Sequence, residues 1–410
     1  MRKGQYQLLI GIIVLTSIVV SLGILYYVSF KPNIVPNNQT TTTTSSPITT
    51  TTSSTTVTTQ PISTTSTTSS TTTQQIQPQP AIGDSVGGSN YITINIGNYN
   101  DACEGWYQGE IKFVVPSYNT MQQTVRQQLQ SMYDNGQRKI VLVIWFGPLQ
   151  NETTATDNKT VWGHIVSDDY YSYGALSPQH QENLKNLIAD IKSIGFNEIV
   201  IRLAADRVEN SPGSSEWQIW KDDQYQRNLQ FIENTRSIVN FAWCSNEQTC
   251  GGNGLLYDLS PENAGIYDTE AVNYTKSLWR DYTAAFGKDD TFGFSFAADW
   301  DLATRVNNMM DIYDSSSAGR PGIYAIEIYD NATWVLNTFH SALSQRGVTS
   351  APVIILESYY NDAQERQELQ SAVQSTGREV LFLAQWPFVR NAACPCLSID
   401  YPQNYSNYLK

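Results

Sequence analysis

The sequence predicts a (β/α)8 barrel, an α/β fold of the TIM-barrel type, preceded by a transmembrane helix and a disordered stalk. Three observations support this. Residues 8–28 are one apolar run, residues 32–81 are nearly all Thr, Ser, Gln and Pro, and strand-like segments alternate with amphipathic segments thereafter. Repeated strand–helix alternation is typical of a closed parallel barrel. The predicted domains are therefore 1–31, 32–81 and 82–410.

The first segment has the length and flanking charges of a membrane anchor. Its apolar run, LLIGIIVLTSIVVSLGILYYV, has about the 20 residues that a helix needs to cross hydrocarbon. Arg2 and Lys3 precede it, which favours a cytoplasmic N-terminus and a barrel outside the membrane. We interpret residues 1–31 as a cytoplasmic stub and a single-pass signal anchor. Cleavage after Ser29 or later is the alternative.

The second segment contains too few large apolar side chains to offset the entropy lost on folding. We therefore predict a disordered stalk for residues 32–81, with a composition typical of O-glycosylation. Sequons for N-glycosylation begin at Asn38, Asn151, Asn158, Asn273, Asn331 and Asn404. On a chain with an export signal, these sequons indicate an extracellular glycoprotein.

Charge and cysteine content narrow the possible partners. The net charge is −13, with 15% charged residues, which disfavours nucleic acid as a partner. The spacing of the five cysteines matches no zinc site, and no other metal or organic cofactor is indicated. We expect disulfides between Cys244 and Cys250, and between Cys103 and either Cys394 or Cys396. The second bridge follows from the expected adjacency of the first and last strands. The oligomeric state is left open.

The strands of the barrel are expected at 91–97, 140–146, 198–204, 255–259, 291–297, 323–329, 353–357 and 380–385. The amphipathic segments are 120–136, 177–195, 222–242, 270–287, 302–314, 331–347 and 361–377. Side chains alternate between the two faces of a strand. Phe292, Phe294 and Phe296 should therefore face the helices, and Ser295 should face the barrel axis.

Acidic side chains follow several strands, at the end where barrel active sites lie. By alternation, Arg202, Asp258 and Glu327 point inward. Glu357 ends the seventh strand on one face with Val353 and Ile355, and Glu262 follows the fourth strand. These two strands lie across the barrel mouth from each other. Two carboxylates about 5–5.5 Å apart can hydrolyse a glycoside with retention, one protonating the leaving oxygen and the other attacking the anomeric carbon.

This layout resembles glycoside hydrolase clan A at the level of pattern, over most of residues 82–410. The resemblance implies a retaining glycoside hydrolase or transglycosidase, with Glu262 as general acid/base and Glu357 as nucleophile. Together with the anchor predicted from residues 8–28, this predicts a membrane-anchored extracellular enzyme that acts on polysaccharide or glycan. The resemblance also implies Tyr329, in AIEIYD, beside the nucleophile and Trp386, in LAQWP, as a sugar platform. Pro261 stands where the clan has an Asn that binds the sugar 2-hydroxyl. That departure supports the alternative function, a non-catalytic carbohydrate-binding or adhesive surface barrel.

The candidate substrate-binding residues are Arg202, Asp258, Asp299, Tyr329, Tyr359 and Trp386. For Arg202, Asp258 and Glu327 we expect a buried ionic network, with direct substrate binding as the alternative, because buried charges need partners. Glu327 is also the rival nucleophile. The alternatives for Glu357 and Glu262 are an ion-paired rim residue and an acid at the first turn of a helix.

Overall fold

The computed structural model describes residues 87–95, 112–146, 160–161, 164–165, 176–205, 222–244, 253–266, 269–298, 300–387 and 389–390. All of them belong to one compact unit, Gln75–Lys410. Among these residues, no helix is both long and apolar enough to cross a membrane. The apolar run 8–28 and the stalk lie outside the described residues, as do Asp299 and the cysteines other than Cys244. The anchor, the stalk and the domain boundaries therefore stay predictions.

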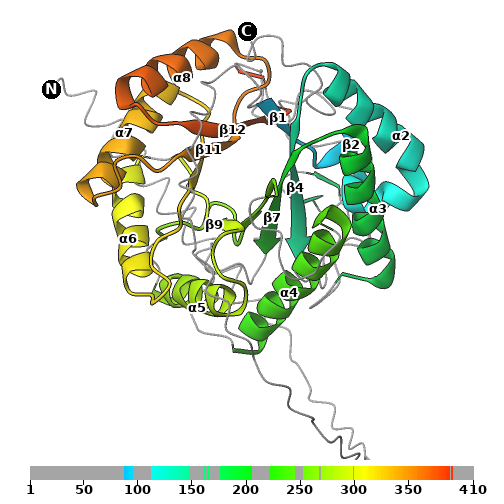
Figure 1. Ribbon diagram of the computed structural model, residues 1–410, viewed down its shortest axis with the longest axis horizontal. Helices are drawn as coiled ribbons and strands as arrows, with labels where there is room; N and C mark the ends of the chain where they lie inside the picture. Colours follow the sequence, from blue (N-terminus) through cyan, green and yellow to red (C-terminus); the bar gives the residue numbers. More distant parts are fainter. Residues whose placement is uncertain are drawn as a thin grey trace, which may run out of the picture. The chain divides into compact units, whose positions relative to one another are not determined.

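Eight parallel strands form the predicted barrel, with helices around them (Figure 1). In spatial order they are β10 (Tyr324–Glu327), β11 (Val353–Glu357), β12 (Val380–Gln385), β1 (Gly87–Asn90), β4 (Lys139–Phe146), β7 (Glu198–Ala205), β8 (Leu255–Asp258) and β9 (Thr291–Gly293). The ring closes just beyond β9. There the Phe296 amide donates to the Ala325 carbonyl at 2.9 Å, and the Glu327 amide donates to the Phe296 carbonyl at 2.9 Å.

The helices are α2 (Val114–Asp134), α3 (Pro178–Ile194), α4 (Asp222–Cys244), α5 (Thr269–Phe286), α6 (Leu302–Asp314), α7 (Ala332–Gln345) and α8 (Ala363–Thr376). Their starts follow local chemistry. Ser177 caps α3 by accepting from the amide of His180, and Asp362 caps α8 by accepting from the amide of Glu365. Cys244, the last residue of α4, is disulfide-bonded, and its partner lies outside the described residues. Both predicted disulfide pairings therefore remain untested.

The first strand was predicted at the wrong place. Barrel strand β1 is Gly87–Asn90, whereas β2 (Thr93–Asn95) pairs antiparallel with β3 (Lys112–Phe113) outside the barrel sheet. The reason is packing around Gly88, where an added Cβ would lie 2.1 Å from the Phe382 ring and 2.8 Å from the Lys139 carbonyl oxygen. The barrel needs a strand of small residues here. Such a strand carries little apolar signal, so the isoleucine-rich segment after it was mistaken for the strand. A second short hairpin joins β5 (Thr160–Val161) to β6 (His164–Ile165).

The barrel has two apolar layers. The interior is filled by Val141, Val200, Phe292, Ala325, Ile354, Leu356, Phe382 and Ala384, and a larger layer lies between the strands and helices. The prediction for Phe292 is wrong, because its ring lies inside the barrel, whereas Phe294 and Phe296 lie in the outer layer. Gly293, with φ of +78°, follows Phe292 where the β8–β9 register shifts, and this changes the alternation.

Candidate active site

Arg202, on β7, is the centre of a buried ionic network at the ends of the strands. Its side chain is 2% exposed, and its Nε donates to Asp258 Oδ2 at 3.2 Å. Its two terminal nitrogens bind one oxygen each of Glu327 and Glu357. A guanidinium group offers donors in three directions within one plane, which suits three carboxyl groups from three strands. The ionic network expected for Arg202, Asp258 and Glu327 is confirmed, and it includes Glu357.

Glu357 reaches this network through an irregularity in β11. Val353 and Ile355 lie in the outer layer, and Ile354 and Leu356 lie inside the barrel. Strict alternation would therefore direct Glu357 outward. Instead, the β10–β11 register shifts so that Ile326 pairs with Ile355 and Glu327 pairs with Glu357. The predicted inward position of Glu357 is confirmed, but the face assigned to Val353 and Ile355 was wrong.

Tyr329, just beyond β10, lies beside Glu357 as the resemblance implied. Its hydroxyl donates to Glu357 Oε2 at 2.6 Å. The Tyr359 ring packs edge-on against the Tyr329 ring, with the ring centres 5.1 Å apart. The guanidinium of Arg390 lies over Tyr359, 4.7 Å from its ring centre. Tyr359 therefore packs between Arg390 and Tyr329 and helps to hold the Tyr329 ring beside Glu357.

Glu262 lies in the turn after β8 and has an unusual backbone conformation. Its φ is +58°, in the left-handed region that non-glycine residues rarely adopt. The Glu262 amide donates to Ser295 Oγ at 2.9 Å, and Ser295 Oγ donates to Asp258 Oδ2 at 2.8 Å. The network of Arg202 therefore continues to the Glu262 backbone through two side chains. Strained backbone held by its surroundings is commonest at functional sites.

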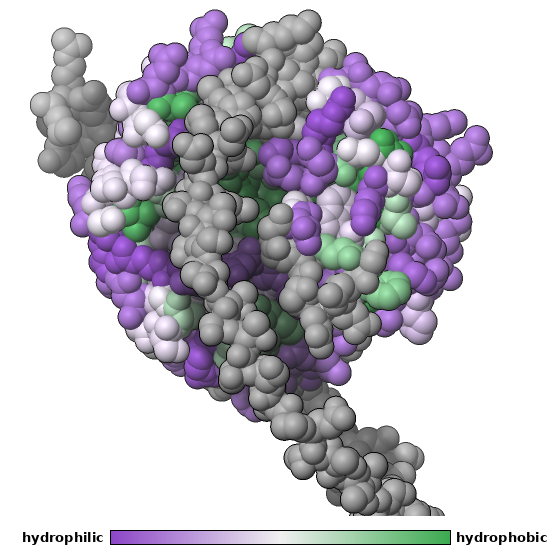
Figure 2. Space-filling model, in the orientation of Figure 1, coloured by the Kyte–Doolittle hydropathy of each residue, from purple (hydrophilic) through white to green (hydrophobic). Residues whose placement is uncertain are grey.

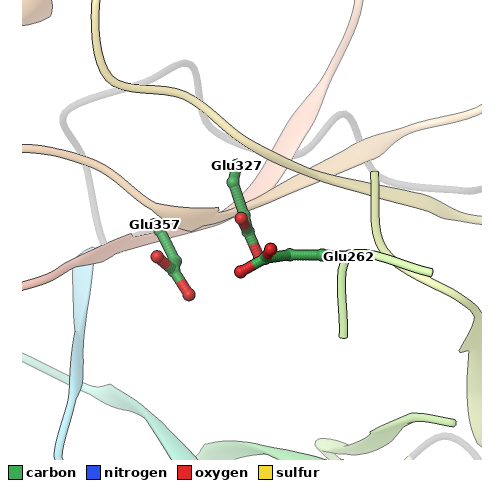
Figure 3. A group of neighbouring side chains, drawn as sticks. All are labelled: Glu262, Glu327 and Glu357. Carbon is green, nitrogen blue, oxygen red and sulfur yellow. The ribbon is translucent and has the colours of Figure 1, made fainter. Parts of the chain in front are cut away.

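The side chains of Glu262, Glu327 and Glu357 converge from three parts of the barrel (Figure 3). One carboxylate oxygen from each lies within 4.8 Å of those of the other two. This limit, which all three pairs meet, is compatible with the separation of about 5–5.5 Å between the carboxyl groups of retaining glycosidases and is shorter than the 6.5–9.5 Å, roughly, of inverting ones. The cluster is also compact enough to hold a cation. However, Arg202 already supplies positive charge to two of the three carboxyls, so the cluster is organised around a guanidinium.

Burial and mutual repulsion dominate the electrostatics. Burial raises the pKa of Glu327 well above its ordinary value, and the charges of Glu262 and Glu357 raise it further, against the opposing charge of Arg202. Burial also raises the pKa of Glu357, which Arg202 and the Tyr329 hydroxyl oppose. The pKa of Tyr329 is raised by burial and by the charge of Glu357, so Tyr329 is a neutral donor.

The sequence missed two residues that shape the site. Ser295 was expected to face inward, but its link between Asp258 and Glu262 was not foreseen. Asn90 ends β1, and its Nδ2 donates to the Leu356 carbonyl at 2.5 Å, one residue before Glu357. Small polar residues at the end of a glycine-rich segment were the available signal, and the misplaced first strand concealed it.

The other residues predicted to bind substrate lie near the strand ends or outside the described residues. Trp386 follows β12 directly, is partly exposed, and its amide donates to the Ser358 carbonyl at 2.9 Å. Asp299 lies outside the described residues, but its neighbour Trp300 is 90% exposed. Trp334, in the first turn of α7, is 44% exposed. Both tryptophans lie on the side of the barrel where the strands end. Figure 2 shows one face of the molecule, with mostly hydrophilic side chains around its outer edge, where the helices lie.

Fold and site together define the class: a parallel (β/α)8 barrel with a carboxyl cluster at its strand ends. No protein-family model matches the sequence, and no curated protein is significantly similar to it. Similar solved structures are glycoside hydrolases. A GH5_18 protein from Streptomyces cattleya, in complex with GlcNAc, is 12% identical over 79% of this chain and 76% of that chain, with a TM-score of 0.48.

Two further glycoside hydrolases show likeness of the same order. A GH113 β-1,4-mannanase is 9% identical over 81% of this chain and 96% of that chain, with a TM-score of 0.42. A fungal β-1,4-galactanase is 12% identical over 78% of this chain and 95% of that chain, with a TM-score of 0.44. Such distant likeness defines no activity or substrate. The function proposed below therefore rests on the geometry of the site.

Arg202→Met should destabilise the protein strongly at neutral pH. The substitution leaves Asp258, Glu327 and Glu357 buried without a cation, and breaking a buried pair in this way costs about 3–5 kcal/mol. The loss should shrink in acid, where the carboxyls take up protons. Urea unfolding of the variant and the wild type, at neutral and at acidic pH, measures this loss of unfolding free energy. The control is Arg280→Met, which removes an exposed ion pair with Asp281 and should cost less than about 1 kcal/mol. Equal losses for the two variants would contradict a structural role for Arg202.

Proposed function

We propose that this protein is a retaining glycoside hydrolase or transglycosidase, with Glu357 as nucleophile and Glu262 as general acid/base. The observation that carries the proposal is the spacing of the carboxyls of Glu262 and Glu357, which have oxygens within 4.8 Å of each other. Their origin on opposite sides of the strand-end face supports the same roles. The hydrogen bond from Tyr329 and the ion pair with Arg202 favour an ionised, correctly oriented Glu357.

The reaction would run in two steps. Glu357 attacks the anomeric carbon and forms a glycosyl ester, while the carboxylic acid of Glu262 protonates the departing glycosidic oxygen. The ionised Glu262 then takes a proton from water, and the hydroxide oxygen displaces Glu357 from the sugar. Each step inverts the anomeric centre, so the product keeps the configuration of the substrate. A sugar hydroxyl in place of water would give transglycosylation.

Exposed aromatic rings near the strand ends favour a carbohydrate with several residues. Trp300 and Trp334 present indole surface to solvent on this side, and an exposed aromatic ring can stack on the face of a sugar. Trp386, Tyr359 and Asp299 remain proposed sugar contacts. Asp258 has no exposed surface, so we expect it to act by holding Arg202 and Ser295 rather than by touching substrate.

The second candidate function is a non-catalytic barrel that binds carbohydrate at a surface. Pro261 favours it, because proline offers no side-chain hydrogen bond to a sugar 2-hydroxyl just before Glu262. The two functions are separated by incubating the purified full-length chain with aryl-glycosides and with polysaccharides, mannan and galactan among them. Release of reducing sugar supports the hydrolase. Binding without release, across the panel, supports the alternative.

We also propose that residues 8–28 anchor the protein in a membrane with the barrel outside. The motivation is the long apolar run after Arg2 and Lys3. Protease added to intact cells should then remove the barrel and leave a short anchored fragment. The matched control is the same treatment after the cells are permeabilised. A barrel that resists protease in intact cells and is digested only after permeabilisation would contradict this orientation.

A further inference from the structure

Glu327 is a third carboxyl in the site, and the reaction steps above do not use it. Glu327 is 6% exposed, and one of its carboxylate oxygens lies within 4.8 Å of an oxygen of each proposed catalytic group. Around it, Arg202 supplies one positive charge, whereas Asp258, Glu262 and Glu357 supply three further carboxyls. If all four carboxyls were ionised, the site would hold three uncompensated negative charges with little water to screen them. Closely spaced carboxyls cannot all ionise under such conditions.

Hydrogen bonds indicate which carboxyl keeps its proton. Asp258 accepts from Arg202 Nε, from the Ser295 amide at 3.2 Å and from the Ser295 hydroxyl at 2.8 Å. Glu357 accepts from Arg202 and from the Tyr329 hydroxyl. Among the described residues, Arg202 alone donates to Glu327. The ionised form of Glu327 is therefore the least stabilised of the three carboxyls that bind Arg202.

We propose that Glu327 carries a proton at neutral pH and is the positioning residue of this site, a neutral carboxyl that holds Arg202 through one oxygen and keeps its proton on the other. The proposal rests on the function proposed above. With Glu327 neutral, the cluster carries one net negative charge in both half-reactions, on Glu357 before attack and on Glu262 after it. An ionised Glu327 would add a second negative charge and oppose the ionisation of Glu357.

Among the described residues, several elements contribute the charged and titratable groups around Glu327. Arg202 on β7 is the cation of this set, Asp258 and Glu262 come from β8 and the turn after it, Glu357 comes from β11, and Tyr329 follows β10, the strand that ends at Glu327. Burial and the charges of Glu262 and Glu357 act together to raise the pKa of Glu327, which agrees with this geometry.

Infrared difference spectroscopy of the full-length chain tests the charge state without any substrate. Glu327→Gln preserves the shape and charge of a protonated carboxyl. The wild-type minus E327Q spectrum at neutral pH should therefore contain the carbonyl stretch of a protonated carboxyl group. Glu233→Gln, an exposed change on α4, is the matched control and should lack this band at the same pH. A carboxylate band in the E327Q difference spectrum would overturn the proposal.

Unfolding as a function of pH gives a second, independent readout. A carboxyl whose folded pKa is raised stabilises the fold below its unfolded pKa and loses that contribution as pH rises towards its folded pKa. Gln does not titrate, so E327Q should gain stability relative to wild type as pH rises. The ratio of their folding equilibrium constants should change by up to about tenfold per pH unit from about pH 5 up to neutral pH. An ionised Glu327 paired with Arg202 would not titrate in this range, so a ratio that stays constant would contradict the proposal.

An E327Q chain that failed to fold would contradict the proposal, because Gln replaces a neutral carboxyl without adding charge. Neither readout requires turnover. A protonated-carboxyl band in a protein that hydrolyses no glycoside would therefore leave the charge state of Glu327 standing and reject the proposed activity. A protein that hydrolyses glycosides but lacks that band would support the proposed activity and reject the protonated state of Glu327.

Discussion

Glu357→Gln should abolish glycoside hydrolysis while leaving the barrel folded. The amide cannot form the glycosyl ester, so the first step of the retaining route is lost. We expect turnover to fall by at least about 10⁴-fold, or about 5.5 kcal/mol of transition-state stabilisation. Gln can still hydrogen-bond Tyr329, so circular dichroism should be unchanged and oligosaccharide binding should persist. Turnover and binding are measured on the same preparation.

The matched control for Glu357 is Glu233→Gln, the same chemical change on an exposed part of α4, which should leave turnover unchanged. Glu327 is the rival nucleophile, because it pairs in register with Glu357 and binds the same guanidinium. Substantial turnover by E357Q would reject Glu357 and leave Glu327 as the candidate. Loss of both turnover and folding would show that the ionic network needs Glu357, and the trapped intermediate described below would then decide its role in the reaction.

Glu262→Ala should slow the hydrolysis of natural glycosides by about 10²–10⁴-fold, the usual contribution of a general acid. An aryl-glycoside with a good leaving group needs no proton, so its first step should be slowed much less. Its second step lacks the base that activates water. Added azide, which needs no such base, should therefore restore turnover and give a glycosyl azide of retained configuration. Kinetics with both substrate types, with and without azide, measure this.

The comparison between the two substrate types contains its own control. If Glu262 only maintained the turn after β8, truncation would slow both substrates equally and azide would have no effect. Such a purely structural effect is conceivable, because Glu262 has a left-handed backbone conformation and its amide is bonded to Ser295. A disturbed turn would therefore also move Ser295. Ser295→Ala removes the acceptor for the Glu262 amide but keeps the carboxyl, and it should slow both substrates alike.

The sequence predicted the barrel well because strand and helix periodicities are local. β11 and β12 have the predicted bounds, and Arg202 and Asp258 face inward as alternation requires. The failures arose from packing between distant segments. Position 88 in strand β1 must be glycine, because Phe382 and Lys139 leave no room for a side chain there. A Gly-rich strand has no hydrophobic pattern from which it could be recognised.

The positions of the carboxyl side chains at the strand ends were easier to predict from the sequence than the contacts among them. Glu262, Glu357 and Tyr329 were placed by their distance from strand ends. The way in which Glu357 enters the barrel depends on a register shift against β10, and no alternation within its own strand indicates it. The link from Asp258 through Ser295 to Glu262 joins two strands and a turn, so it also depends on tertiary contacts. The proposed charge state of Glu327 depends on both the register shift that brings Glu357 inward and the link that positions Glu262.

A trapped glycosyl-enzyme would test the central claim most directly. A 2-deoxy-2-fluoro glycoside with a good leaving group slows the second step of a retaining enzyme, so the covalent intermediate accumulates. The substrate screen described above supplies the sugar to use. Mass spectrometry of the intact chain should show the added sugar, and peptide mapping should locate it on Glu357. A glycoside that is hydrolysed without any covalent adduct, or an adduct located on Glu327, would contradict the account.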